Sequence, residues 1–200
     1  MMHRKTVFKT SIFPSSEEKL WQNLLRPKMM QFISSPWVTL TPITSQEMTE
    51  EWVEGRTYRF QIRILGLIPS GTHTIIVEEI DPKEHEIRLQ EFNFMIPVWN
   101  HTIYLRKVNE SNTLFADKVE IFSGWKTPAI YHFAVRYFTA CHRKIRTMLQ
   151  TPEQSVPDIL PDPKEELKEK AFSPKALLIT AAAACAVTLV VSRRKNKRKK

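Results

Sequence analysis

The chain changes its hydrophobic period near residue 125, and this change limits the folds open to it. Segment 57–64, TYRFQIRI, alternates apolar and polar residues, and later segments up to residue 122 do the same. A period of two is that of a β-strand with one buried face. From 127 to 150 the apolar residues recur every three or four positions, the period of an amphipathic helix. Strands followed by one long helix predict an α+β fold in which the helix covers one face of the sheet.

The order of the expected elements follows from the same patterns. A strand over 5–13 ends at Pro14, and Ser15 with Glu18 forms a capping box that begins a helix. A second short helix is expected over 27–33. Short turns, among them GLIPSG after residue 65, indicate an antiparallel sheet of six or seven strands. Its further strands are expected at 57–64, 72–80, 86–94, 98–108 and 113–122, and 37–41 and 51–53 are short candidates.

Two local patterns connect this order to a known superfamily. WNHTIYL (99–105) followed by FADKVEI (115–121) resembles the paired strands of the SRPBCC (START-like) superfamily. RYFTACHRKIRTML (136–149) resembles the terminal helix of its uncharacterised, polyketide cyclase/dehydrase-like members. The resemblance covers residues 4–150 and implies the helix-grip fold, a curved antiparallel sheet around a long C-terminal helix. It also implies an internal cavity for a hydrophobic ligand.

The side chains expected to face the helix are mostly large and apolar. By themselves they indicate a filled core, and the resemblance favours a cavity that binds a lipid or another hydrophobic small molecule. The expected ligand-binding residues are Tyr58, Phe60, Ile62, Trp99, His101, Ile103, Phe115, Asp117, Val119, Tyr137, Phe138 and Cys141.

His101 and Asp117 are the polar members of this set, and alternation places them on adjacent strands. Such a pair could orient a ligand or transfer a proton, and a satisfied buried pair is the alternative. They are the candidates for catalysis, and binding without catalysis is favoured. No metal site and no cofactor are expected. The other histidines, His73, His85, His132 and His142, are expected to be ordinary surface or core residues, and the basic helix residues Arg136, Arg143, Lys144 and Arg146 to face solvent.

The end of the chain has a different character. Residues 176–192 are uncharged, and residues 193–200, RRKNKRKK, are almost all basic. The formal net charge is +9, but this tail carries seven positive charges, which leaves +2 for the rest of the chain. A basic nucleic-acid surface is therefore not expected. Segment 175–192 predicts a single transmembrane helix, and the tail a contact with anionic lipid.

The predicted organisation has four parts. A ligand-binding domain over 1–150 is followed by a proline- and charge-rich linker over 151–174, an anchor over 175–192 and a basic tail over 193–200. Because the first residues lack an apolar signal segment, the domain is expected on the cytosolic side of a membrane. The chain is thus predicted to be a membrane-anchored binder of a hydrophobic molecule. The alternatives are a cyclase/dehydrase-type enzyme that uses the same cavity and an interaction module whose cavity is filled.

Overall fold

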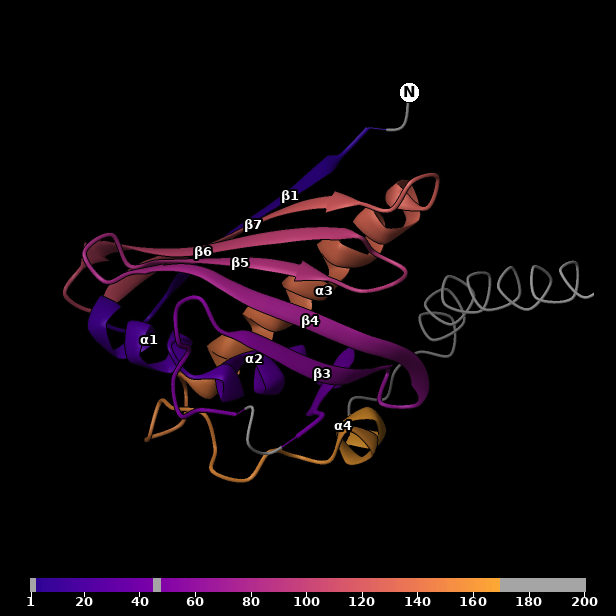
Figure 1. Ribbon diagram of the computed structural model, residues 1–200. Helices are drawn as coiled ribbons and strands as arrows, with labels where there is room; N and C mark the ends of the chain where they lie inside the picture. Colours follow the sequence, from indigo (N-terminus) through magenta and orange to yellow (C-terminus); the bar gives the residue numbers. More distant parts are fainter. Residues whose placement is uncertain (1–2, 45–47, 170–200) are drawn as a thin grey trace, which may run out of the picture.

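The computed structural model describes residues 3–44 and 48–169. One curved antiparallel sheet packs with its concave face against helices (Figure 1), in the strand order β1-β7-β6-β5-β4-β3-β2. The strands are β1 (Lys5–Phe13), β2 (Val38–Pro42), β3 (Thr57–Ile64), β4 (Ile68–Asp81), β5 (Glu86–Phe92), β6 (Val98–Asn109) and β7 (Asn112–Phe122). The helices are α1 (Glu17–Leu24), α2 (Pro27–Ser34), α3 (Thr127–Met148) and α4 (Pro163–Glu169).

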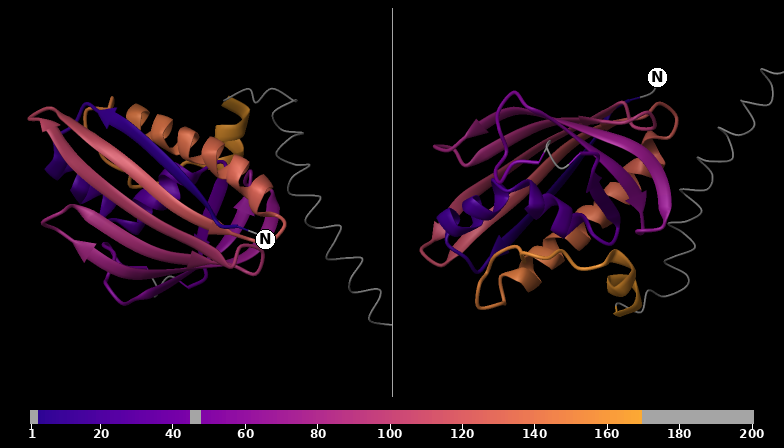
Figure 2. Two further views of the ribbon diagram at one scale, coloured as in Figure 1. Left: turned by 90° about the horizontal axis from the view of Figure 1, so that it is seen from above. Right: turned by 60° about the horizontal axis from the view of Figure 1, so that its bottom comes forward.

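The long helix α3 lies under the sheet, against the edge formed by β1 and β7 (Figures 1 and 2). The first strand pairs with the last, with Val7 opposite Val119 and Phe13 opposite Thr113. The short helices α1 and α2 fill the concave face beside α3. The predicted α+β helix-grip arrangement is confirmed.

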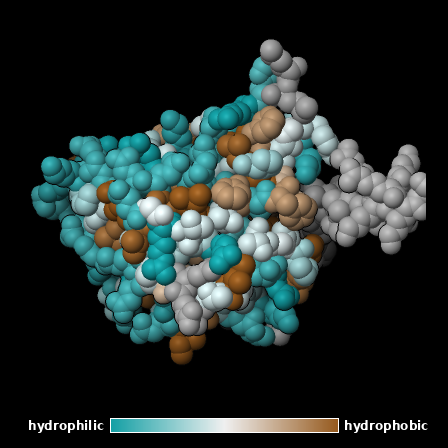
Figure 3. Space-filling model, viewed as in Figure 1, coloured by the Kyte–Doolittle hydropathy of each residue, from teal (hydrophilic) through white to brown (hydrophobic). Residues whose placement is uncertain are grey.

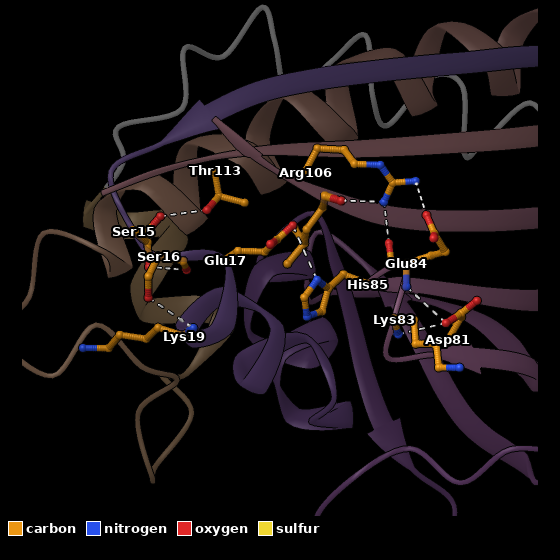
Figure 4. Close-up of polar contacts among 11 residues, drawn as sticks. Ser15, Ser16, Glu17, Lys19, Asp81, Lys83, Glu84, His85, Arg106 and Thr113 are labelled. Atoms are coloured by element: carbon orange, nitrogen blue, oxygen red, sulfur yellow. Dashed lines mark hydrogen bonds and ion pairs between the residues drawn. The ribbon is translucent and has the colours of Figure 1, made fainter. Parts of the chain in front are cut away.

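The first helix begins one residue later than predicted. Ser16 is its N-cap, and the backbone N–H of Lys19 donates to Ser16 Oγ at 3.4 Å. Ser15 is buried instead, and its carbonyl oxygen accepts a hydrogen bond from Thr113 Oγ1 at 2.8 Å (Figure 4). The residue before the helix thus connects it to β7.

Two strand predictions also needed correction. β4 begins at Ile68, inside the segment predicted as a turn, because residues 65–67 already reverse the chain, with positive φ angles at 65 and 66. Residues 51–53 form no strand. Their alternation reflects the burial of Trp52, whose ring packs edge-on against Tyr58 with centroids 4.8 Å apart.

The buried apolar residues form two clusters. The larger one joins the sheet to α1, α2 and the C-terminal end of α3. The smaller one lies toward the N-terminal end of α3 and consists of Val7, Trp99, Val119, Ile121, Ala134 and Phe138. Strands β1, β6 and β7 contribute to both clusters, so the residues between them on these strands separate two apolar regions.

The described part of the predicted linker packs against the domain. Val156 is buried and its N–H donates to Asn23 Oδ1 at 3.2 Å. Glu166 on α4 forms a buried ion pair with Lys144 of α3. Residues 151–169 therefore follow the helical side of the molecule (Figure 2). Lys144, predicted to face solvent, is buried because this segment covers it.

Among residues 3–44 and 48–169, no helix combines the length and apolar character needed to cross a membrane. The predicted anchor over 175–192 and the basic tail over 193–200 lie outside the described residues.

Candidate functional site

A row of ionisable side chains crosses the concave face, and its members on β6 and β7 lie between the two apolar clusters. His73 lies on β4, Glu91 on β5, His101 on β6 and Asp117 on β7, and His142 of α3 meets the end of the row. We call these five residues the polar belt. Their side chains are only 4–12% exposed.

The belt is diagonal because of the strand register. His101 lies directly opposite Leu89, and Glu91 is two residues farther along β5. In the same way Asp117 lies opposite Ile103, two residues beyond His101. Two-residue steps keep each side chain on the same face of the sheet, so strand alternation places the whole row inside the protein.

Hydrogen bonds connect the belt from end to end. His73 Nε2 lies 2.7 Å from Glu91 Oε2, and Glu91 Oε1 lies 3.1 Å from His101 Nδ1. His101 Nε2 is 2.7 Å from Asp117 Oδ1, and Asp117 Oδ2 is 2.6 Å from His142 Nε2. Imidazoles and carboxylates alternate, so every close contact is between a possible donor and an acceptor.

His101 is the central group of the belt and carries a positive charge at neutral pH. Burial alone would lower its pKa, but the hydrogen bonds to Asp117 and Glu91 outweigh burial and raise the pKa to about 9. For the two carboxyl groups burial acts in the opposite direction, raising the pKa. Glu91 accepts hydrogen bonds from His101 and His73, and Asp117 accepts them from His101 and His142. These bonds outweigh the effect of burial, so the pKa of each carboxyl group is lowered. Both carboxyl groups are therefore ionised.

Asn93 fixes the tautomer of His73, which lies at the β4 end of the belt. Its Oδ1 accepts the backbone N–H groups of Met95 and Ile96, at 2.9 and 2.8 Å. Its amide nitrogen is thereby directed to His73 Nδ1, 3.4 Å away. Nδ1 is an acceptor in this contact, so the ring proton is on Nε2 and is donated to Glu91.

The middle of the belt forms one wall of an internal cavity of about 40 Å³. Glu91, His101 and Asp117 are its ionised residues. The remaining lining residues are Leu24, Met29, Met30, Ile33, Ser34, Trp52, Trp99, Ile103, Phe115, Tyr137, Phe138 and Cys141. A wider surface groove of about 1120 Å³ lies between α3 and residues 151–161, without contribution from the belt. The internal cavity combines apolar walls with converging polar groups, as ligand sites do.

Comparison with known families gives one match that spans most of the chain. Residues 11–149 match the model of a family described as a domain of unknown function, DUF8410. The chain belongs to this family. A search of the curated proteins gave no match.

Solved structures similar to this DUF8410 chain share its fold at low sequence identity. Protein Ms6760 from Mycobacterium smegmatis is 11% identical with a TM-score of 0.56, covering 74% of this chain and 91% of its own. Norcoclaurine synthase from Thalictrum flavum is 10% identical with a TM-score of 0.55, covering 74% and 87%. Major latex-like protein 151 from Panax ginseng is 9% identical with a TM-score of 0.56, covering 74% and 99%. These likenesses support the helix-grip fold.

The DUF8410 structure brings eight of the predicted ligand-binding residues to the cavity wall. They are Trp99, His101, Ile103, Phe115, Asp117, Tyr137, Phe138 and Cys141. The other four, Tyr58, Phe60, Ile62 and Val119, are buried in the apolar clusters and do not line this cavity. Strand alternation identified the correct face, but the position of the cavity along each strand depends on α2 and α3.

Three members of the belt, Glu91, His142 and His73, were not predicted as site residues. Glu91 was detectable, since it alternates with the apolar Ile87 and Leu89 and so had to point inward. His142, treated as an ordinary histidine, lies one helical turn after Phe138 on the buried stripe of α3. His73 is the third. For all three, the sequence signal was an ionisable residue at a position that the local period places on the buried face.

The belt does not form a metal site. Within residues 3–44 and 48–169, no group of three or more His, Cys, Asp or Glu side chains is placed to hold a metal ion. Each imidazole nitrogen of the belt faces its own partner, which is a carboxylate, an amide or a hydroxyl group. The hydroxyl group is Ser11 Oγ, 2.8 Å from His142 Nδ1. This arrangement makes a chain and not a common centre.

Proposed function

We propose that the internal cavity binds a small molecule with an apolar body and one polar group. The observation that carries the proposal is the wall that joins apolar side chains to the ionised residues Glu91, His101 and Asp117. Buried charges are costly to retain, and a filled core would be served by apolar residues there. The position of the cavity between sheet and long helix, in a fold that hosts binding proteins, supports the same function.

The cavity must widen to admit such a molecule. Its volume of about 40 Å³ has room for about three water molecules, at ~10–15 Å³ each. Pockets for drug-sized ligands measure ~300 Å³ or more. Met29, Met30 and Ile33 of the short helix α2 form one wall, and methionine side chains change conformation easily. We therefore expect α2 to move outward when a ligand binds.

Binding can be tested with octan-1-ol, which has an apolar chain and an uncharged head. Calorimetric titration of the full chain should show saturable binding. Cys141→Phe fills the cavity from α3 and should weaken the affinity by about tenfold or more. His132→Phe makes an equally large side chain at an exposed position of the same helix and should leave binding unchanged, which also controls for partition into detergent or lipid.

A second filling variant protects this test against misfolding. Ile33→Phe narrows the cavity from α2, and its thermal transition should show that the fold is kept. Equal octanol binding by wild type and by both filling variants would exclude the cavity as the site. That result would favour the interaction module with a filled cavity, which the small volume supports. On the face seen in Figure 3, however, apolar side chains lie in separate patches among hydrophilic ones.

The belt supports binding more than the cyclase/dehydrase alternative. Both ring N–H groups of His101 already donate to carboxylates, Nδ1 to Glu91 and Nε2 to Asp117. A general acid must present its proton to the substrate. His101 would have to break one of these charge-assisted bonds first, so the resting geometry is that of a fixed binding wall.

We further propose that segment 175–192 anchors the protein in a membrane, with the domain on the cytosolic side and the basic tail near anionic lipid. The proposal rests on the sequence, which has seventeen uncharged residues over 176–192 followed by seven basic residues in the last eight. A cavity for an apolar molecule would then lie close to the phase in which such molecules dissolve.

A further inference from the structure

We propose that the molecule bound in this cavity is an apolar amine, held in its ammonium form against Glu91 and Asp117. The inference rests on the proposed function, because it names the chemical class of the ligand in the same cavity. Three properties of the wall carry it: its unused hydrogen-bonding capacity, its net charge and its aromatic lining.

The ionised side of the wall offers acceptors. A carboxylate has about four lone-pair positions, and the belt uses one on each oxygen. His73 and His101 donate to the two oxygens of Glu91. His101 and His142 donate to the two oxygens of Asp117. The remaining acceptor capacity belongs to carboxylates that line the cavity, while both N–H groups of His101 are already used. A ligand head group can therefore bond to these carboxylates only if it donates a hydrogen bond.

The ionised lining residues also carry a net negative charge. Glu91 and Asp117 are both ionised, and one positive charge, on His101, lies between them. These three residues therefore sum to one negative charge. A cation at the wall would complete the charge balance in a region of low dielectric, where the uncompensated charge is costly. A carboxylate ligand would instead meet a wall of its own sign.

The other two ionisable residues that line the cavity, Tyr137 and Cys141, add no charge to the wall. Burial raises the pKa of Tyr137 and of Cys141, so both stay protonated and neutral. Tyr137 Oη and Ser34 Oγ lie 2.6 Å apart and bond to each other. Lys144, three residues after Cys141 on α3, is paired with Glu166.

The rest of the lining suits a cation with an apolar body. Aromatic rings make up a large part of it, and ring faces attract ammonium groups when water is excluded. These rings belong to Trp52, Trp99, Phe115, Tyr137 and Phe138. An alkyl or aryl chain can pack against the same residues, while the ammonium group donates to the carboxylates.

The test compares three ligands that share an eight-carbon chain and differ in the head group: octylamine, octan-1-ol and octanoate. Each is titrated into the full chain near pH 7, where the amine is cationic and the acid is anionic. Octylamine should bind about tenfold or more tightly than octanol, as expected for a hydrogen bond to a charged group. Octanoate should bind more weakly than octanol.

Charge-removing variants assign the preference to the belt. Glu91→Gln and Asp117→Asn keep the size of each side chain and remove one negative charge. Each should abolish most of the advantage of octylamine while octanol binding stays within about twofold. Glu110→Gln makes the same change at an exposed site and should leave all three affinities unchanged. Because Asp117 holds two histidines, Glu91→Gln is the safer variant if Asp117→Asn unfolds.

Each outcome has a distinct meaning. Octanoate binding as tightly as octylamine, or octanol binding more tightly than it, would overturn the amine inference and leave the binding function standing. Equal weakening of octylamine and octanol in Glu91→Gln would also overturn it, since the carboxylate would then act only through packing. Failure of all three ligands to bind would overturn the proposed function itself.

Discussion

At the scale of single residues, the central imidazolium is stabilised by its two neighbours. His101 is 6% exposed, and a buried cation without partners would be strongly destabilising. Glu91 and Asp117 compensate its charge from opposite sides of the ring, and Phe138 of α3 packs edge-on against it with centroids 5.2 Å apart. The charge is thus held by three strands and a helix at once.

This arrangement predicts a pH dependence of stability. Because folding raises the pKa of His101 from 6.5 to about 9, the folded state binds this proton more tightly than the unfolded state. The resulting stabilisation is complete below pH 6.5 and is lost as the pH rises through 9, a loss of about 3 kcal/mol. Chemical denaturation of the full chain at several pH values should show this fall in the free energy of unfolding.

Substitution identifies the group responsible. In His101→Gln the fall between pH 6.5 and 9 should flatten, while His132→Gln, at an exposed histidine, should keep the wild-type slope. A wild-type slope in His101→Gln would show that another group titrates. At acidic pH the slope of stability with pH has the opposite sign. Glu91 and Asp117 have lowered pKa values, so the stabilisation that they contribute is lost as the pH falls through those values.

The residues of the belt show how far the sequence can predict a site. Alternation on β6 and β7 placed His101 and Asp117 on the inner face, and the structure finds them bonded there. Alternation could also have placed Glu91 on β5, and the helical period could have placed His142 on the buried face of α3. The hydrogen bonds that join the five residues could not be predicted. They depend on the diagonal register of the strands and on the position of α3 relative to the sheet, and both are set by packing across the whole chain.

At the scale of elements, the segment after α3 has a structure that the sequence did not predict. Residues 151–169 have no hydrophobic period, so proline and charge predicted a linker. In the structure, Lys144 of α3 donates to Glu166 and, at 3.0 Å, to the carbonyl oxygen of Ser35. The Lys144 ammonium also lies 4.4 Å from the centroid of the Phe32 ring. Contacts between distant residues hold α4 in place, and local patterns carry no signal for them.

Removing the carboxylate of α4 should therefore destabilise the domain. Glu166→Ala removes the carboxylate that pairs with the buried ammonium of Lys144, and a loss of about 3 kcal/mol in the free energy of unfolding is expected. Glu153→Ala, at an exposed position of the same segment, should change it by less than about 0.5 kcal/mol. Denaturant titration of the full chain measures both.

A double variant tests the cause. Replacing both partners, in Lys144→Met with Glu166→Met, removes the buried charges together and should recover most of the lost stability. If Glu166→Ala unfolds at the wild-type denaturant concentration, the ion pair does not hold α4 against the domain.

At the scale of the whole molecule, the proposed anchor can be tested by one charge. Arginine at the centre of a membrane helix costs about 2.5–3.5 kcal/mol, which is comparable to the insertion free energy of so short and alanine-rich a segment. Ala183→Arg should therefore release the protein from membranes on alkaline carbonate washing, with unchanged far-ultraviolet circular dichroism. Changing the lysines and arginine of 197–200 to glutamine should leave carbonate resistance intact. Release of the wild type under the same washing would contradict a membrane-spanning segment.

The pairing of the first strand with the last also has a consequence for biosynthesis. Phe13 pairs with Thr113, one hundred residues later in the chain. At translation rates of about 5–20 residues per second, β1 leaves the ribosome roughly 5–20 seconds before its partner. During that time it is a strand without a sheet, and contacts so distant in sequence are among the slowest to form. The nascent chain therefore completes its sheet late, when β7 has emerged and closes the edge.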